Sequence, residues 1–416
     1  MRLKFWLLRI LDGFLYRNRW LIFLFLDNNA IRYIFLDKYL CNRPELFRAY
    51  YAWKPVWGRP GKILILKTDA IGDYLLFRNY LEEMALHFRP MGYRMVLAGN
   101  QAWKELALQL DSGFIDEFVW LDRGGMNRKP SPEKQLEFLR QINRYSYSRL
   151  LYPNFSREWE AGDWLVKHIP SKEKYAFDGN VVNQTIEQHR EGNFFYTRLI
   201  EPERQGKFDF YRNGEIVSAF TGKNSLMEAP RIAFNQSSEN KKPYAVFFPG
   251  ASFESRRWPE ESFSQLGELI FTHLGTKVKL AGGPGESVLC GMIAQANPAV
   301  FENLAGKTSL PELLELISNS SLLISNDTSA IHMGAQSGVP SICIYKGNNY
   351  GRCMPYPEGL LSNFRICMPE QLKSMPPEER IRRFSENDGL DIRTISVDQV
   401  WEATLLILTK IGGWKS

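Results

Sequence analysis

Two carboxylates, Asp69 and Asp73, follow an apolar run at residues 62–66, in a loop that leads into a helical pattern at residues 75–88. A short apolar run of this kind is typical of a buried strand. The loop lacks the GxGxxG pattern of dinucleotide-binding folds. Because ligands of open α/β sheets bind at the carboxyl ends of the strands, Asp73 could act as a general base there. A helix cap is the alternative role for this aspartate.

A second candidate site follows another buried strand, which the sequence predicts at residues 322–324. Asn326, Asp327, Thr328 and Ser329 are residue types that cap helices, and apolar helical spacing begins just after them. A helix start at this edge of a sheet presents free N–H groups and the positive end of the helix dipole, which favours a phosphate. A well-capped helix without a ligand is the alternative.

Two further loops carry side chains suited to a nucleotide. Arg256 and Arg257 follow a strand predicted at residues 244–248, and guanidinium groups can bind diphosphate oxygens in a forked geometry. A surface loop with an Arg–Trp stack is the alternative. Gly283 and Glu286 lie in the next glycine-rich loop. The glycine permits close approach of the backbone to a ligand, and the carboxylate could accept hydrogen bonds from ribose hydroxyls.

Strands and helices alternate along most of the chain, which predicts an α/β protein with two Rossmann-like domains. We expect an N-terminal domain over residues 61–240 and a C-terminal domain over residues 241–395, with a closing helix at 396–416. Two stretches are less regular in sequence. A helical pattern covers residues 184–199, and residues 367–392 are expected to be irregular because they are rich in proline and charge.

Residues 1–60 form a basic, aromatic extension for which we expect helical structure. None of its apolar runs reaches the eighteen or so residues of a membrane-spanning helix, and charged residues interrupt the region that a signal peptide would need. An amphipathic segment within residues 1–55 that lies on an anionic membrane surface fits this composition. A helical extension packed on the domain or on a partner is the alternative.

Composition excludes several classes of protein. The 416-residue chain is 44% apolar and 24% charged, as a globular protein is, and its net charge of +6 is too small to mark a nucleic-acid binder. The five cysteines are scattered and form no metal-ligand motif. Reduced thiols predict a cytoplasmic protein.

Five ordered sequence blocks resemble the ADP-heptose:lipopolysaccharide heptosyltransferase family. The loop at residues 67–73 is similar to the KTSxxGD loop of that family. The remaining blocks are similar to its later motifs in the same order, and they lie at residues 249–259, 281–286, 303–308 and 325–332. The resemblance does not extend to residues 1–60.

This resemblance implies a GT-B fold, with two Rossmann-like domains facing a cleft. It implies an inverting, metal-independent transfer of a sugar from a nucleotide diphosphate, with ADP-heptose as donor, no cofactor, and a lipopolysaccharide or other lipid-linked glycan as acceptor. The protein would then work in the cytoplasm, on the inner membrane. The family motifs assign the general base to Asp73, the donor diphosphate to Arg256, Arg257, Asp327, Thr328 and Ser329, the nucleoside to Gly283 and Glu286, and a supporting role to Lys67 and His332.

The acceptor is the least defined part of this prediction. Asp69 stands where the family usually has serine, so this carboxylate would act on Asp73 by like-charge proximity or contact a different acceptor. Arg123 and Arg128 belong to a basic loop that could meet an anionic acceptor, although most such loops are solvated surface. Two other functions are compatible with the fold, namely a nucleotide-sugar epimerase and a non-catalytic scaffold for glycan assembly.

Overall fold

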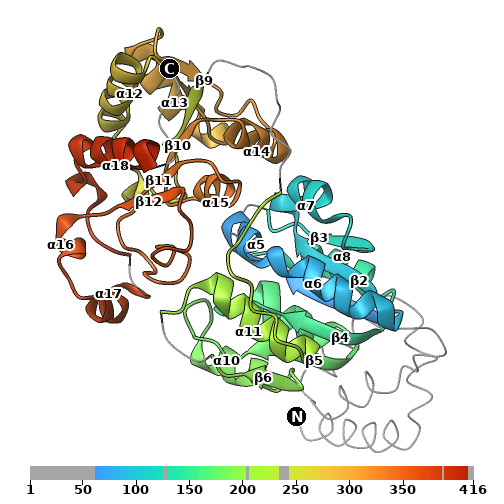
Figure 1. Ribbon diagram of the computed structural model, residues 1–416. Coiled ribbons are helices and arrows are strands. Elements are labelled where there is room, and N and C mark those ends of the chain that lie inside the picture. The colour runs from blue at the N-terminus through green and yellow to red at the C-terminus, as the bar shows by residue number, and fades with distance from the viewer. Residues whose placement is uncertain (1–60, 125–128, 203–205, 234–242, 387, 411–416) are drawn as a thin grey trace, which may run out of the picture.

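In the computed structural model of the chain, residues 61–124, 129–202, 206–233, 243–386 and 388–410 are described (Figure 1). They form two α/β domains, each built on a parallel six-stranded sheet. The extension at residues 1–60, Arg128 and the segment 234–242 around the expected domain boundary lie outside the described residues.

The N-terminal sheet has the strand order β3-β2-β1-β4-β5-β6, and all its strands are parallel. From β1 the chain first winds outward through β2 and β3 and then returns to the other side of β1. The strands are β1 (Lys62–Lys67), β2 (Arg94–Asn100), β3 (Glu117–Leu121), β4 (Tyr147–Tyr152), β5 (Ser171–Phe177) and β6 (Arg198–Ile200). The chain leaves β1 toward one side of the sheet and β4 toward the other, so the gap between the loops after these two strands is a topological switch point. Ligands of such sheets bind there.

Helices cover both faces of this sheet (Figure 1). For this reason the central strands are apolar on both faces, and every residue of 63–66 in β1 is fully buried. The helices are α5 (Ile71–Phe77), α6 (Asn79–Phe88), α7 (Lys104–Asp111), α8 (Pro132–Ile142), α9 (Trp164–His168), α10 (Ile186–Asn193) and α11 (Asp209–Thr221).

The C-terminal sheet repeats this plan with the order β12-β11-β10-β7-β8-β9. Its switch point lies between β7 and β10. The strands are β7 (Tyr244–Phe248), β8 (Lys277–Leu280), β9 (Phe301–Asn303), β10 (Leu322–Asn326), β11 (Ser341–Ile344) and β12 (Phe364–Cys367). The helices are α12 (Glu260–Leu274), α13 (Ser287–Ala296), α14 (Leu310–Ser318), α15 (Ser329–Gln336), α16 (Glu370–Lys373), α17 (Pro377–Phe384) and α18 (Val397–Lys410).

Three local predictions were wrong in detail. The helix expected at residues 75–88 begins earlier and is divided into α5 and α6 at Arg78. The helical pattern at 184–199 contains only α10, and the chain then enters β6. Residues 367–392, which were expected to be irregular, contain α16 and α17; prolines stand at or just before the start of both helices, where the missing N–H costs nothing.

The two domains meet through α5 and α15, and through α7 and α14 (Figure 1). Asn79 Nδ2 lies 3.4 Å from Gln336 Oε1 across this interface. The His332 ring packs against Gly72, where an added Cβ would lie 3.1 Å from the ring. Glycine at position 72 thus allows α15 to approach the first turn of α5, which carries Asp73. Within the described residues, we find no helix with the length and apolar character needed to span a membrane.

Candidate active site

A cleft of about 520 Å³ lies between the two domains. The carboxyl ends of β1 and β4 border it on one side, and those of β7, β10 and β11 border it on the other. Both topological switch points therefore open onto the same space. Of the residues predicted to form the site, those that line the cleft are Lys67, Asp69, Asp73, Arg123, Arg256 and Asp327.

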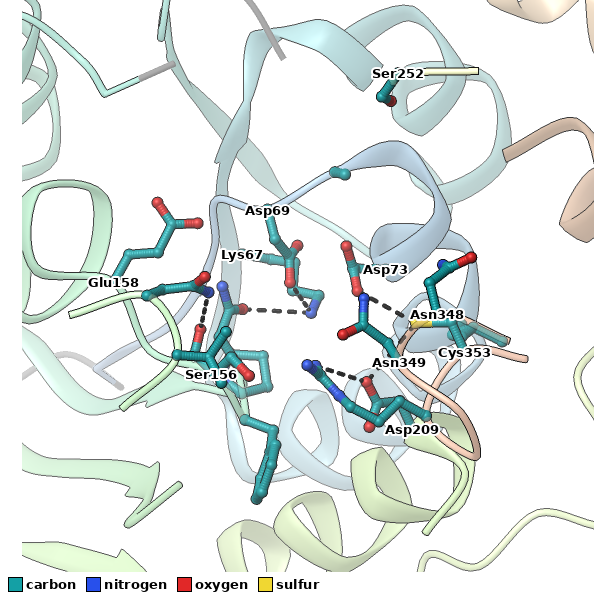
Figure 2. Close-up of a pocket in the computed structure, with 18 of the residues that line it drawn as sticks. Lys67, Asp69, Asp73, Ser156, Glu158, Asp209, Ser252, Asn348, Asn349 and Cys353 are labelled. Carbon is teal, nitrogen blue, oxygen red and sulfur yellow. Dashed lines mark hydrogen bonds and ion pairs between the residues drawn. The ribbon is translucent and has the colours of Figure 1, made fainter. Parts of the chain in front are cut away.

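Asp73 lies in the first turn of α5, three residues beyond the N-cap residue Ala70. The N-cap residue Ala70 makes no side-chain capping hydrogen bond, and Asp73 lies inside the helix rather than at the N-cap position. Its carboxylate faces a loop of the C-terminal domain (Figure 2), and Cys353 Sγ donates to Asp73 Oδ1 over 3.8 Å. A carboxylate at this position can accept a proton from a group that enters the cleft.

The backbone of the loop that carries Asp69 and leads into α5 is fixed by other parts of the N-terminal domain. The carbonyl oxygen of Asp69 accepts hydrogen bonds from Asn100 Nδ2 at 3.1 Å and from Trp103 Nε1 at 3.2 Å. Thr68 Oγ1 donates to the carbonyl oxygen of Ala161 at 2.7 Å, in the π-helical turn Trp159–Asp163. These contacts hold the loop in place before any substrate binds, as a catalytic site requires.

Asp69 forms an ion pair with Lys67, whose Nζ lies 2.6 Å from Asp69 Oδ2. Lys67 Nζ also donates to Asn154 Oδ1 at 3.3 Å. Burial raises the pKa of Asp69 to about 7; the charge of Lys67 opposes this rise and the charge of Asp73 adds to it. The charge of Asp73 therefore acts on Asp69, whereas the predicted action of Asp69 on Asp73 stays a prediction.

Asp209, the first residue of α11, is a site residue that sequence reasoning missed. It forms an ion pair with Arg212 of the same helix and another, at 3.2 Å, with Arg352 of the C-terminal domain. Cys353 Sγ lies 3.8 Å from Asp209 Oδ2. Burial alone would raise the pKa of Asp209, but the two arginines lower it below its ordinary value. No motif marks this aspartate, and its interdomain partner Arg352 is 143 residues away in sequence.

The ligand atoms of Asp73, Asp209 and Cys353 lie within 4.8 Å of one another, a spacing that a metal ion could also use. However, the guanidinium groups of Arg212 and Arg352 already contact Asp209, and their positive charge opposes a cation at this point. The arrangement is better described as a hydrogen-bonded contact between the two domains.

On the opposite side of the cleft, Arg256 and Arg257 have different roles. Arg256 lines the cleft and lies 3.7 Å from Asp388. Arg257 turns back and donates from Nε and Nη2 to the carbonyl oxygen of Ala251, at 3.2 and 3.1 Å. Arg256 is therefore positioned to meet a ligand, whereas Arg257 stabilises the loop after β7.

Asp327 and Thr328 stand at the start of α15, as predicted from the helix-capping residues. Asn348 Nδ2 donates to Asp327 Oδ2 at 3.0 Å, and burial raises the pKa of Asp327. Thr328 is the N-cap; its Oγ1 accepts from the backbone N–H of Ala330 at 3.3 Å. The Thr328 hydroxyl is thus used by its own helix, and Ser329 is the first helical residue.

Comparison with known proteins agrees with this geometry. The profile of glycosyltransferase family 9 (heptosyltransferase) matches residues 199–376. The resemblance to the heptosyltransferase family is confirmed. Lipooligosaccharide heptosyltransferase 2 of Haemophilus influenzae is 34% identical over 110 residues, which are 25% of this chain and 32% of that protein. The chain thus matches about a third of the length of its first curated relatives.

Solved structures of heptosyltransferases share the fold over most of their length. The glycosyltransferase family 9 protein of Veillonella parvula has a TM-score of 0.63 at 17% identity, covering 85% of this chain and 98% of that one. E. coli heptosyltransferase WaaC with ADP has a TM-score of 0.61 at 18% identity, covering 83% of this chain and 99% of that one. The GT-B fold predicted from the sequence is confirmed, since the two domains face a common cleft.

Several residues of the heptosyltransferase motifs lie away from the cleft. His332 is buried behind it, with Nδ1 2.9 Å from the Tyr356 hydroxyl, and burial lowers its pKa to about 4. Glu286 packs over the loop after β7, where a Cβ on Gly250 would lie 2.3 Å from its Cγ. Gly283 begins the short turn that leads to Glu286. Because its imidazole is buried with a lowered pKa and packs against Gly72 of the other domain, His332 acts as a neutral contact between the domains.

Arg123 belongs to the supporting structure of the heptosyltransferase-like loop at residues 67–73. Its Nη1 donates to the carbonyl oxygen of Thr68 at 2.8 Å, and its Nη2 forms an ion pair with Glu158 at 2.7 Å. This guanidinium group connects the end of β3 with the loops after β1 and β4. Its position favours a structural role over direct recognition of an anion.

Proposed function

We propose that this protein is an inverting glycosyltransferase that transfers heptose from ADP-heptose to a lipopolysaccharide-type glycan of the cell envelope. The observation that carries the proposal is that Asp73 of one domain and Arg256 and Asp327 of the other line a single cleft. The family 9 profile and the heptosyltransferase relatives support the same reaction.

The proposed reaction begins with the acceptor hydroxyl next to Asp73. A sugar hydroxyl is a poor nucleophile, and Asp73 would take its proton as the new C–O bond forms on the face of the sugar opposite the leaving group. One displacement on that face inverts the configuration of the anomeric carbon. Cys353 would have to give up its contact with Asp73 as the hydroxyl arrives.

The nucleoside diphosphate leaves on the other side of the cleft. Negative charge that develops on its phosphate would be stabilised by Arg256 and by the N–H groups at the start of α15. Fixed positive charges of this kind can replace a metal ion, so we propose that the reaction is metal-independent. Interdomain contacts such as that between Asp209 and Arg352 would hold the cleft closed and protect the donor from water.

Replacing Arg256 by alanine tests the donor site. A hydrogen bond to a charged group contributes about 1.5–3 kcal/mol, so we expect Arg256→Ala to weaken ADP-heptose binding by roughly tenfold to hundredfold. Binding is measured as the rise in the melting temperature of the protein when each of a panel of ADP-, GDP-, UDP- and TDP-sugars is added. A ligand raises this temperature because it stabilises the folded state that it binds. Arg383→Ala on the exposed face of α17 is the matched control. If the nucleotide sugar raised the melting temperature of both variants equally, Arg256 would not be part of the donor site.

We further propose that the enzyme works at the cytoplasmic face of the inner membrane. The basic, aromatic composition of residues 1–55 supports binding to anionic lipids. Co-sedimentation with vesicles of anionic and of neutral lipid, with and without residues 1–55, tests this part. Equal sedimentation of the full and shortened chains would contradict it.

Incubation with the donor alone separates the proposal from its main alternative. A nucleotide-sugar epimerase changes the configuration of the donor sugar without an acceptor, whereas a glycosyltransferase does not. An altered nucleotide sugar in that mixture would favour the epimerase.

A further inference from the structure

The N-terminal side of the cleft is where the acceptor must lie if the proposed function is correct, because Asp73 is there. Among the described residues, this wall has no excess of positive charge: its own residues include four cations and five carboxylates, and Arg352 from the other domain adds a fifth cation. Four cations line it, namely Lys67, Arg123, Lys129 and Arg212, together with five carboxylates, namely Asp69, Asp73, Glu158, Glu160 and Asp209.

Each of these four cations already has a carboxylate partner. Lys67 pairs with Asp69 at 2.6 Å, Arg123 with Glu158 at 2.7 Å, Lys129 with Glu160 at 2.7 Å, and Arg212 with Asp209. Arg352, which reaches this wall from the other domain, also pairs with Asp209. An anion that entered here would compete with these carboxylates for every cation of the described wall.

The donor side of the cleft differs in this respect. The ion-pair partner of Arg256 there is Asp388, which lies 3.7 Å away and does not line the cleft. The positive charge available to a phosphate is thus concentrated where the donor is proposed to bind.

The remaining polar residues of the acceptor wall are uncharged. They are amides and a hydroxyl, from the loop after β4, the segment before α10 and the first turns of α11: Asn154, Ser156, Asn183 and Asn213. Such groups can both donate and accept hydrogen bonds, as sugar hydroxyls do. Ion-paired carboxylates also keep lone pairs that can accept from a hydroxyl.

We propose that the acceptor residue that reaches Asp73 is an uncharged sugar, and that the carboxylate of Asp69 helps to exclude glycans carrying a phosphate or carboxylate next to the reacting hydroxyl. Asp69 and Asp73 already interact by like-charge repulsion, and Asp209 lies close to Asp73. A further negative group next to Asp69 and Asp73 would be repelled by these two carboxylates, whereas the charge of Asp209 is already balanced by Arg212 and Arg352. This inference rests on the proposed function.

The test identifies the residue to which the sugar is attached. The full-length protein is incubated at pH 8, above the pKa of Asp69, with radiolabelled ADP-heptose and envelope glycan from cells that lack its gene. The product is cleaved to the labelled disaccharide, which is then separated by anion exchange. We expect the label on a neutral residue, and label on a phosphorylated or carboxylated residue would overturn the inference. Failure to label any glycan would instead refute the proposed transfer of heptose, and the inference with it.

A variant tests the role of Asp69 itself. Asp69→Asn removes one negative charge and releases Lys67, so we expect its preference for neutral over phosphorylated acceptor glycan to fall by about tenfold relative to wild type. The readout is the ratio of the two kcat/KM values, which a general loss of folding would not change. Glu379→Gln, the same change in a surface ion pair on α17, is the control. If Asp69→Asn had the same ratio of kcat/KM values as the wild type, Asp69 would not contribute to the choice of acceptor.

Discussion

Asp73→Asn is expected to lower kcat for sugar transfer by about 10²–10⁴-fold, the usual contribution of a general base. The amide has nearly the same size as the carboxylate but cannot accept the proton of the acceptor hydroxyl. Donor binding should be unchanged, because Arg256 and α15 lie on the other side of the cleft. The measurement is transfer of labelled heptose, with EDTA present so that metal independence is tested in the same assay.

The matching thermal-shift measurement separates chemistry from folding. If Asp73→Asn keeps the melting temperature of the wild type and the same rise in that temperature with donor, but loses sugar transfer, then Asp73 is the general base. Transfer at a near wild-type rate would show that another group accepts the proton. Loss of wild-type transfer in EDTA would show that a metal is needed, and the grouping of Asp73, Asp209 and Cys353 would then be the place to look for it.

Asp209→Asn is expected to lower the free energy of unfolding by about 3–5 kcal/mol, the usual cost of removing one partner from a buried ion pair. The variant leaves the guanidinium groups of Arg212 and Arg352 without their carboxylate, and Asp209 is only 9% exposed. Glu379→Gln, which breaks an exposed pair with Arg383, should cost no more than about 1 kcal/mol. Urea denaturation of both variants at pH 7 measures the difference.

The pH dependence of this effect has a definite sign. The pKa of Asp209 is lowered in the folded protein by its arginine partners, against the effect of burial. The ion pairs therefore contribute fully above the unfolded-state pKa of about 3.9, and their contribution is lost as the pH falls through the lower folded-state value. The gap between wild type and Asp209→Asn should stay constant from pH 8 to 5 and shrink below about pH 4. A gap that is constant to pH 3 would contradict this account.

Much of the fold could be predicted because it depends on local patterns. The buried strands β1, β7 and β10 are continuous apolar runs followed by loops with capping residues, and such runs predict a parallel sheet covered on both faces. By contrast, β5 was missed because its sequence begins Ser-Lys-Glu-Lys and only its second half is buried. Local pattern cannot detect a strand whose burial depends on its neighbours.

The site was predictable only where a motif marks it. Asp73 and Asp327 follow central strands, so the switch-point rule and the family resemblance both identify them. The cross-cleft partners carry no such signal: Cys353 lies 280 residues from Asp73 in sequence, and only the packing of the two domains brings them together. Two adjacent arginines lie at the end of the short turn at Glu254–Arg256 and just after it, and the structure places Arg256 at the cleft and turns Arg257 back to Ala251.

The central claim is that a nucleotide sugar bound at Arg256 and the start of α15 presents its anomeric carbon to Asp73 across the cleft. A crystal structure with ADP-heptose, or with an analogue that cannot be cleaved, measures this most directly. The account predicts diphosphate oxygens about 3 Å from the Arg256 guanidinium and from N–H groups of α15, with the sugar directed toward Asp73. A diphosphate bound at the N-terminal wall, or a sugar directed away from Asp73, would contradict it.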